Sequence, residues 1–148
     1  MQRWIIAGVV LLVFTFGAGF IGIRIYKQNR PYPVWVPLPV NSELSGEKKL
    51  QFSKELKQKL GEHSYLLSLS KDLELAKKWK IASNEEAANL VAARLFVKVG
   101  EADTSKGTKI PSINIGVNGK AKDKEISNEI ALRLHRDVRK MLGIDQDP

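Results

Sequence analysis

The spacing of hydrophobic residues changes several times along the chain, and each spacing predicts a different element. Residues 31–42 carry valine or leucine at every second position from Val34, while three prolines and Trp35 fall on the opposite face. Proline cannot donate a hydrogen bond to a β-ladder. This segment is therefore either an edge strand or an extended polyproline-type spacer.

Helical spacing comes after this extended segment. After Ser45, apolar residues recur every four positions until Gly61, which is a typical helix end. A second helix is expected from Ser64, with leucines on its inner side. A third helix should begin at residues 83–86, because a serine three positions before a glutamate is the capping-box pattern.

The C-terminal part of the chain contains two strand patterns and one helix pattern. Residues 95–99 favour a strand, and from Ile110 apolar and polar residues alternate until Gly119, as in a half-buried strand. Asp123 can cap a last helix, whose apolar positions keep a 3.6-residue period up to Gly143.

A longer apolar stretch precedes all these elements. Residues 4–23 carry no charge, and only Thr15 among them has a polar side chain. Twenty helical residues span roughly 30 Å, the thickness of the hydrocarbon core of a bilayer. We therefore predict an uncleaved transmembrane anchor in the lipid bilayer, in preference to a buried core helix or a cleaved signal peptide.

The predicted anchor has an aromatic start, an apolar span and a basic flank that can reach lipid headgroups. Its residues are Trp4, Thr15, Ile23, Arg24, Lys27 and Arg30. The count of basic residues places the C-terminal side in the cytoplasm. A short N-terminus before a long apolar run is instead typical of a signal anchor, which exports the C-terminal part of the chain. The residues alone leave both orientations open.

The predicted organisation has four parts. Residues 1–30 form the membrane anchor with its basic flank, 31–44 the extended Pro-rich segment, 45–143 an α+β domain, and 144–148 a polar tail. The expected fold class is α+β, with an N-terminal transmembrane helix followed by a small two- to four-stranded sheet packed with helices.

The distribution of charge along the chain helps to decide between nucleic acid and lipid as a partner. The 148 residues carry 24 Lys+Arg and 16 Asp+Glu, a net charge of +8. Residues 1–42 contribute +4 without any acidic residue, and residues 43–148 contribute 20 basic less 16 acidic groups. The basic residues of the last helix lack the interleaved aromatics and motifs of nucleic-acid-binding proteins. We prefer lipid headgroups to nucleic acid as the partner of the basic flank.

No sequence pattern typical of catalysis or of a metal site occurs. The chain has no cysteine and two histidines, and it has no nucleophile elbow, P-loop or paired-histidine motif. We therefore expect a protein that is not an enzyme, with no catalytic residue, metal or cofactor. The candidate interaction residues are Trp35, Arg133, Arg136 and Lys140.

Three stretches together carry a family resemblance. They are the apolar extended segment 34–40 after the predicted span, the helical stretch 65–79 with its Leu-x-Leu pair before a tryptophan, and the strands 95–99 and 113–117 with the helix after them. Residues about 50–140 thus resemble the N-terminal domain of polysaccharide chain-length determinants, also called polysaccharide co-polymerases. The family's second membrane span and kinase domain have no counterpart here, so a reduced, single-span relative is expected.

The resemblance implies a non-enzymatic module in envelope polysaccharide biosynthesis or export. Such a module acts by self-association, as a homo-oligomer, or by contact with a membrane protein partner, a polymerase or an exporter. It also implies a single-pass protein of the cytoplasmic (inner) membrane, with its C-terminal domain on the periplasmic side. The alternative is a small structural or scaffold subunit of a larger membrane complex.

Overall fold

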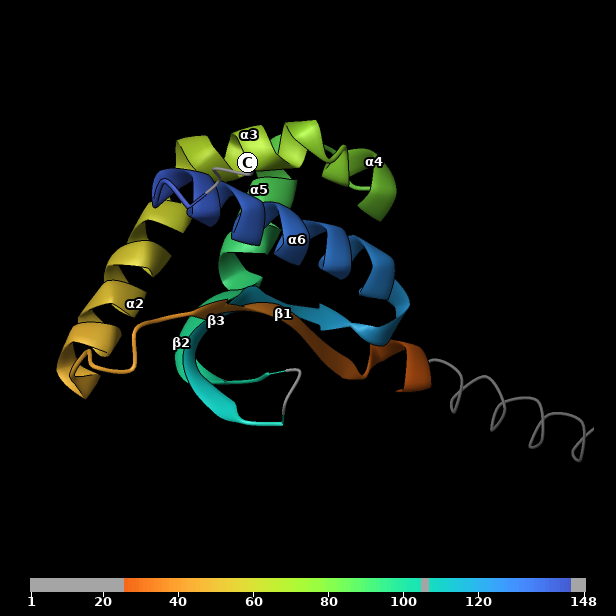
Figure 1. Ribbon diagram of the computed structural model, residues 1–148. Helices are drawn as coiled ribbons and strands as arrows, with labels where there is room; N and C mark the ends of the chain where they lie inside the picture. The colour runs from red at the N-terminus through yellow and green to blue at the C-terminus, as the bar shows by residue number, and fades with distance from the viewer. Residues whose placement is uncertain (1–25, 105–106, 145–148) are drawn as a thin grey trace, which may run out of the picture.

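The computed structural model describes residues 26–104 and 107–144. Helices α3 to α6 lie together on one side of a small sheet, and α2 runs beside its β2 edge (Figure 1). The elements in chain order are β1 (Pro31–Pro39), α2 (Gly46–Leu60), α3 (His63–Asp72), α4 (Leu75–Trp79), α5 (Asn84–Arg94), β2 (Leu95–Asp103), β3 (Lys109–Lys120), the 3₁₀ turn η1 (Ala121–Asp123) and α6 (Lys124–Met141).

The sheet has three antiparallel strands in the order β1-β3-β2. Strands β2 and β3 form a hairpin, whereas β1 joins the other side of β3 from a distant part of the sequence. Val117 of β3 lies opposite Val34 of β1 and opposite Leu95 of β2. The alternation predicted from residue 110 onward therefore belongs to the central strand.

The core lies between the sheet and the helices. Ile113, Ile115 and Val117 point from β3 into it and are at most 1% exposed. Their neighbours are the apolar inner faces of the helices, as the predicted helical spacing requires. Fully or almost fully buried helix residues include Leu56, Leu60, Leu66, Leu69, Val91, Ile130, Leu134 and Val138.

Side-chain caps account for two of the helix starts. The Ser45 hydroxyl accepts a hydrogen bond from the Lys48 amide (3.4 Å), and the Ser83 hydroxyl accepts one from the Glu86 amide (3.1 Å). The prediction of a cap at 83–86 is thus confirmed. Asp123 occupies the N-cap position of α6 as predicted, but its carboxylate makes no capping bond and pairs with Arg94 of α5.

The prolines of β1 face away from the sheet's hydrogen bonds. The Val40 amide donates to the Pro111 carbonyl of β3 (3.0 Å), so even-numbered residues direct their amides toward β3. The odd-numbered positions point outward, where a proline removes no ladder bond. Pro31, Pro33, Pro37 and Pro39 occupy four of these positions. Residues 31–39 are therefore an edge strand rather than a spacer.

The predicted membrane-anchored fold class needs correction. Among the helices of residues 26–104 and 107–144, none is both long and apolar enough to cross a membrane. The segment 4–23, to which the transmembrane helix and signal anchor were assigned, lies outside the described residues, as does Arg24. The structure supports a small α+β fold with a three-stranded sheet and helices.

Gly116 lies where the backbone of β1 passes close to β3, which gives a testable prediction. A Cβ at this position would contact the Val34 carbonyl oxygen and lie 2.7 Å from the Cβ of Trp35. We expect Gly116→Ala to lower the free energy of unfolding by about 2 kcal/mol or more, because backbone atoms cannot move aside without distorting the sheet.

Chemical denaturation measures this effect, with Gly46→Ala as the control. A Cβ at position 46, the first residue of α2, meets nothing within 4 Å. Equal unfolding midpoints for the two variants would show that β1 does not approach Gly116 as described.

Candidate functional site

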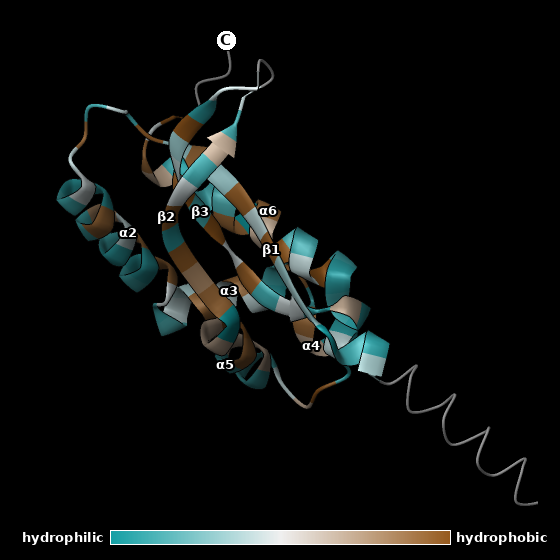
Figure 2. Cartoon of the chain, turned by 90° about the horizontal axis from the view of Figure 1, so that it is seen from below, coloured by the Kyte–Doolittle hydropathy of each residue, from teal (hydrophilic) through white to brown (hydrophobic). Residues whose placement is uncertain are grey.

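The sheet has one face that no helix covers in the described part of the chain. Seen from below, its three strands lie in front of the helices (Figure 2). Trp35 projects from this face and is 49% exposed. This face, with Trp35, Pro33, Pro37, Phe96, Lys98 and Asn114 on it, is called the open sheet face below.

The centre of the open sheet face is aromatic. Gly116 of β3 lies in register with Trp35 of β1 on one side and with Phe96 of β2 on the other. Gly116 places no side chain between the two aromatic residues. The Lys98 ammonium lies 5.6 Å from the centroid of the Phe96 ring, within cation–π range. This surface can bind a partner by ring packing and hydrogen bonds.

The outer edge of β1 is poorly suited to pairing with a strand of a partner. Of its outward-directed positions, only Trp35 retains an amide hydrogen, because the others are proline. A partner strand would find acceptors but almost no donors along this edge. Contact through the face is therefore favoured over extension of the sheet.

The basic residues predicted as interaction residues are not brought together with Trp35. Arg136 and Lys140 are on α6, which packs on the other side of the sheet. Arg133 is half-buried: its Nε donates to Asp137 (2.9 Å to Oδ2) and its Nη2 donates to Asp72 of α3 (2.9 Å). Arg133 thus joins two helices.

Tyr65 completes the group that links α3 to α6. Its hydroxyl donates to Asp137 Oδ2 at 2.9 Å. Burial, and then this hydrogen bond to a carboxylate, raise the pKa of Tyr65 above its ordinary value. The hydrogen bond to Asp137 likewise raises the pKa of Arg133. Sequence reasoning missed this group because Tyr65 and Asp137 are 72 positions apart.

The pKa of Tyr65 predicts how stability changes at alkaline pH. A folded-state pKa above the unfolded value of about 10 means that the stabilisation is complete below pH 10 and is lost as pH rises further. We expect Tyr65→Phe to flatten the fall of the free energy of unfolding above pH 10, by up to about 1.4 kcal/mol per pH unit.

Denaturant titrations between pH 8 and pH 11 test this prediction. Tyr32→Phe is the control, because Tyr32 is a more exposed tyrosine (38%) whose ring centroid lies 5.4 Å from the Lys124 ammonium. A Tyr65→Phe curve parallel to that of the original protein would contradict it.

The basic flank of the predicted anchor is only partly described. Trp4, Thr15, Ile23 and Arg24 lie outside the described residues. Lys27 and Arg30 are exposed, and the Arg30 guanidinium lies 5.2 Å from the centroid of the Tyr26 ring. The Arg30 carbonyl accepts a hydrogen bond from the Ala121 amide (3.0 Å), which holds the start of β1 against η1.

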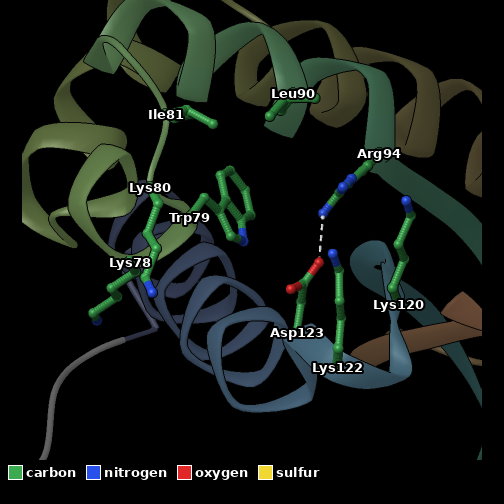
Figure 3. Close-up of a pocket in the computed structure, with 9 residues that line it drawn as sticks. All are labelled: Lys78, Trp79, Lys80, Ile81, Leu90, Arg94, Lys120, Lys122 and Asp123. Carbon is green, nitrogen blue, oxygen red and sulfur yellow. Dashed lines mark ion pairs between the residues drawn. The ribbon is translucent and has the colours of Figure 1, made fainter. Parts of the chain in front are cut away.

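A pocket that sequence reasoning missed lies where α4, α5 and η1 meet. Trp79, Arg94 and Asp123 converge on it from these three elements (Figure 3). Its volume is about 520 Å³. It is called the Trp79 pocket below, and its lining residues are Lys78, Trp79, Lys80, Ile81, Leu90, Arg94, Lys120, Lys122 and Asp123.

Comparison with known proteins adds no relative. No protein-family model matches the chain, and no curated protein or solved structure matches it. The resemblance to polysaccharide chain-length determinants stays a prediction.

Proposed function

We propose that this chain is a non-enzymatic interaction module, and that it acts by contact between the open sheet face and a protein partner. The observation that supports this best is the half-exposed indole of Trp35 at the centre of an uncovered sheet face. Tryptophan is among the residue types that contribute most to binding energy at interfaces.

The strand that carries Trp35 favours binding in a second way. Pro33 and Pro37 flank it, and Gly116 approaches it from β3, so the indole stands on a backbone with little freedom. A surface that is already ordered loses less conformational entropy when it binds. The module can therefore gain affinity from a small contact area.

We propose two kinds of partner for this face. One is a second copy of the chain, and the other is a different protein, such as a polymerase or exporter of envelope polysaccharide. The polysaccharide setting is proposed from the resemblance of residues about 50–140 alone. An interaction module in another complex would use the same face, so the two parts of the proposal are tested separately.

The contact itself is tested by replacing Trp35. We expect Trp35→Ala to weaken association at least about tenfold, as for a central interface tryptophan. Leu132→Ala is the matched control, because Leu132 is 57% exposed on α6, away from the open sheet face.

Two measurements detect the association. Sedimentation equilibrium of the full chain reports self-association, and a photoreactive amino acid at position 35 or 132 reports other partners in cells. Crosslinks at 35 that are missing at 132 support the proposal. A chain that stays monomeric and gives the same crosslinks at both positions would refute it.

The polysaccharide setting is tested by deleting the gene and sizing the surface polysaccharide on a gel. We expect an altered length distribution or yield, restored by the original gene and not by the Trp35→Ala form. An unchanged polysaccharide would refute the role in polysaccharide biosynthesis. It would not bear on the proposed contact through Trp35, which the preceding experiments test.

A further inference from the structure

The Trp79 pocket has more positive charge than its own carboxylates neutralise. It is lined by five cationic side chains and one carboxylate. Arg94 lies 3.6 Å from Asp123, and Lys78 pairs with Glu129 of α6. Within the described residues, no carboxylate lies within ion-pair distance of the other three, which are Lys80, Lys120 and Lys122.

Two buried donors lie in the same place. Trp79 Nε1 is buried and has no hydrogen-bond partner in the described structure, and Arg94 Nη1 is buried with the Asp123 carboxylate oxygen 3.6 Å away, beyond hydrogen-bond distance. The Arg94 guanidinium stacks 5.1 Å from the centroid of the Trp79 indole, which fixes the two groups relative to each other. Both groups thus stand beside the lysines that have no carboxylate partner in the described part of the chain, so the site favours an anionic ligand.

The remaining wall of the pocket is apolar. Ile81 and Leu90 line it on the side opposite Lys120 and Lys122 (Figure 3). A volume of about 520 Å³ falls in the range of small-molecule sites, about 300–1,000 Å³, and exceeds what a single inorganic anion fills. The ligand should therefore have both an anionic end and a part that contacts these apolar side chains.

We propose that the Trp79 pocket binds a phosphorylated small molecule. Its phosphate oxygens pair with Lys120 and Lys122 beside the Arg94 guanidinium, and its remaining part lies against Ile81 and Leu90. A phosphate group fits better than a single carboxylate, because it carries up to two charges and accepts bonds from several directions.

Asp123 does not oppose this binding, because Arg94 neutralises it. Its side chain is 13% exposed and that of Arg94 is 20% exposed, so the pair lies at the inner end of the pocket. We infer that Asp123 is a positioning residue, which holds the guanidinium beside the indole. The lysines at 120 and 122 are exposed and supply the charge nearer the opening.

Calorimetric titration of the full chain with ADP and with pyrophosphate tests the proposal at low ionic strength. We expect ADP to bind saturably and more tightly than pyrophosphate or adenosine, because only ADP offers both parts of the ligand. The double variant Lys120→Gln/Lys122→Gln should weaken ADP binding at least tenfold, and Trp79→Phe should weaken it several-fold because the smaller ring holds the Arg94 guanidinium less firmly.

The matched control is Lys48→Gln/Lys59→Gln, which removes the same charge from exposed positions of α2. It should change ADP binding less than twofold. Equal weakening by the two double variants would indicate general electrostatic attraction and would overturn the proposal. The lysine variants keep the test valid if Trp79→Phe fails to fold.

Three further outcomes would also overturn it. One is the absence of saturable ADP binding up to millimolar concentration. Another is pyrophosphate binding as tightly as ADP, which would show that contact with Ile81 and Leu90 does not contribute to binding. The third is an oligoglutamate peptide that binds more tightly than ADP and is weakened by the Lys120→Gln/Lys122→Gln variant, which would identify the occupant as an acidic peptide.

Discussion

The fold depends on the burial of one face of β3. Ile113 and Ile115 are 0% exposed and Val117 is 1% exposed, and each contributes about 1.5–3 kcal/mol by leaving water. These three side chains form the floor on which the helices pack. β3 is the central strand, and a strand on each side pairs with its backbone. The hairpin supplies β2 locally, and β1 must come from the other end of the described chain.

The sequence of β1 reflects this position. Its even residues must pair with β3 and face the core, as Val34 and Leu38 do. Its odd residues neither donate hydrogen bonds to β3 nor face the core. Proline is therefore tolerated at these positions, where it removes the hydrogen-bond donors of an exposed edge. The same alternation places Trp35 on the uncovered face. Edge protection and presentation of the indole are thus two consequences of a single pattern.

Short-range patterns predicted most of the elements and little of the candidate sites. Helix starts at Ser45 and Ser83 and the alternation of β3 depend on neighbours within a few positions, so periodicity detects them. Apolarity alone also led to a membrane-spanning fold class that the described helices do not support. The contacts of Arg133 were not predictable for a different reason: its partners include Asp72, 61 positions away. The Trp79 pocket likewise joins residues from separate elements, which only the tertiary fold brings together.

The backbone beside the Trp79 pocket is strained at two residues, which lowers the stability of the fold. Helix α4 has five residues and is bounded by Glu74 and Lys80, both in the left-handed region at φ 50° and 56°. Such conformations in non-glycine residues cost of order 1 kcal/mol or more each. They turn the chain so that Trp79 enters the space beside Arg94, where unneutralised lysines and unsatisfied donors add a further cost. Backbone strain, charges of the same sign and an unpaired indole donor thus occur together at this pocket. Between α3 and α6, in contrast, Tyr65 bonds to Asp137 and Arg133 bonds to Asp72. A bound anion would compensate the charge of the lysines that have no carboxylate partner among the described residues.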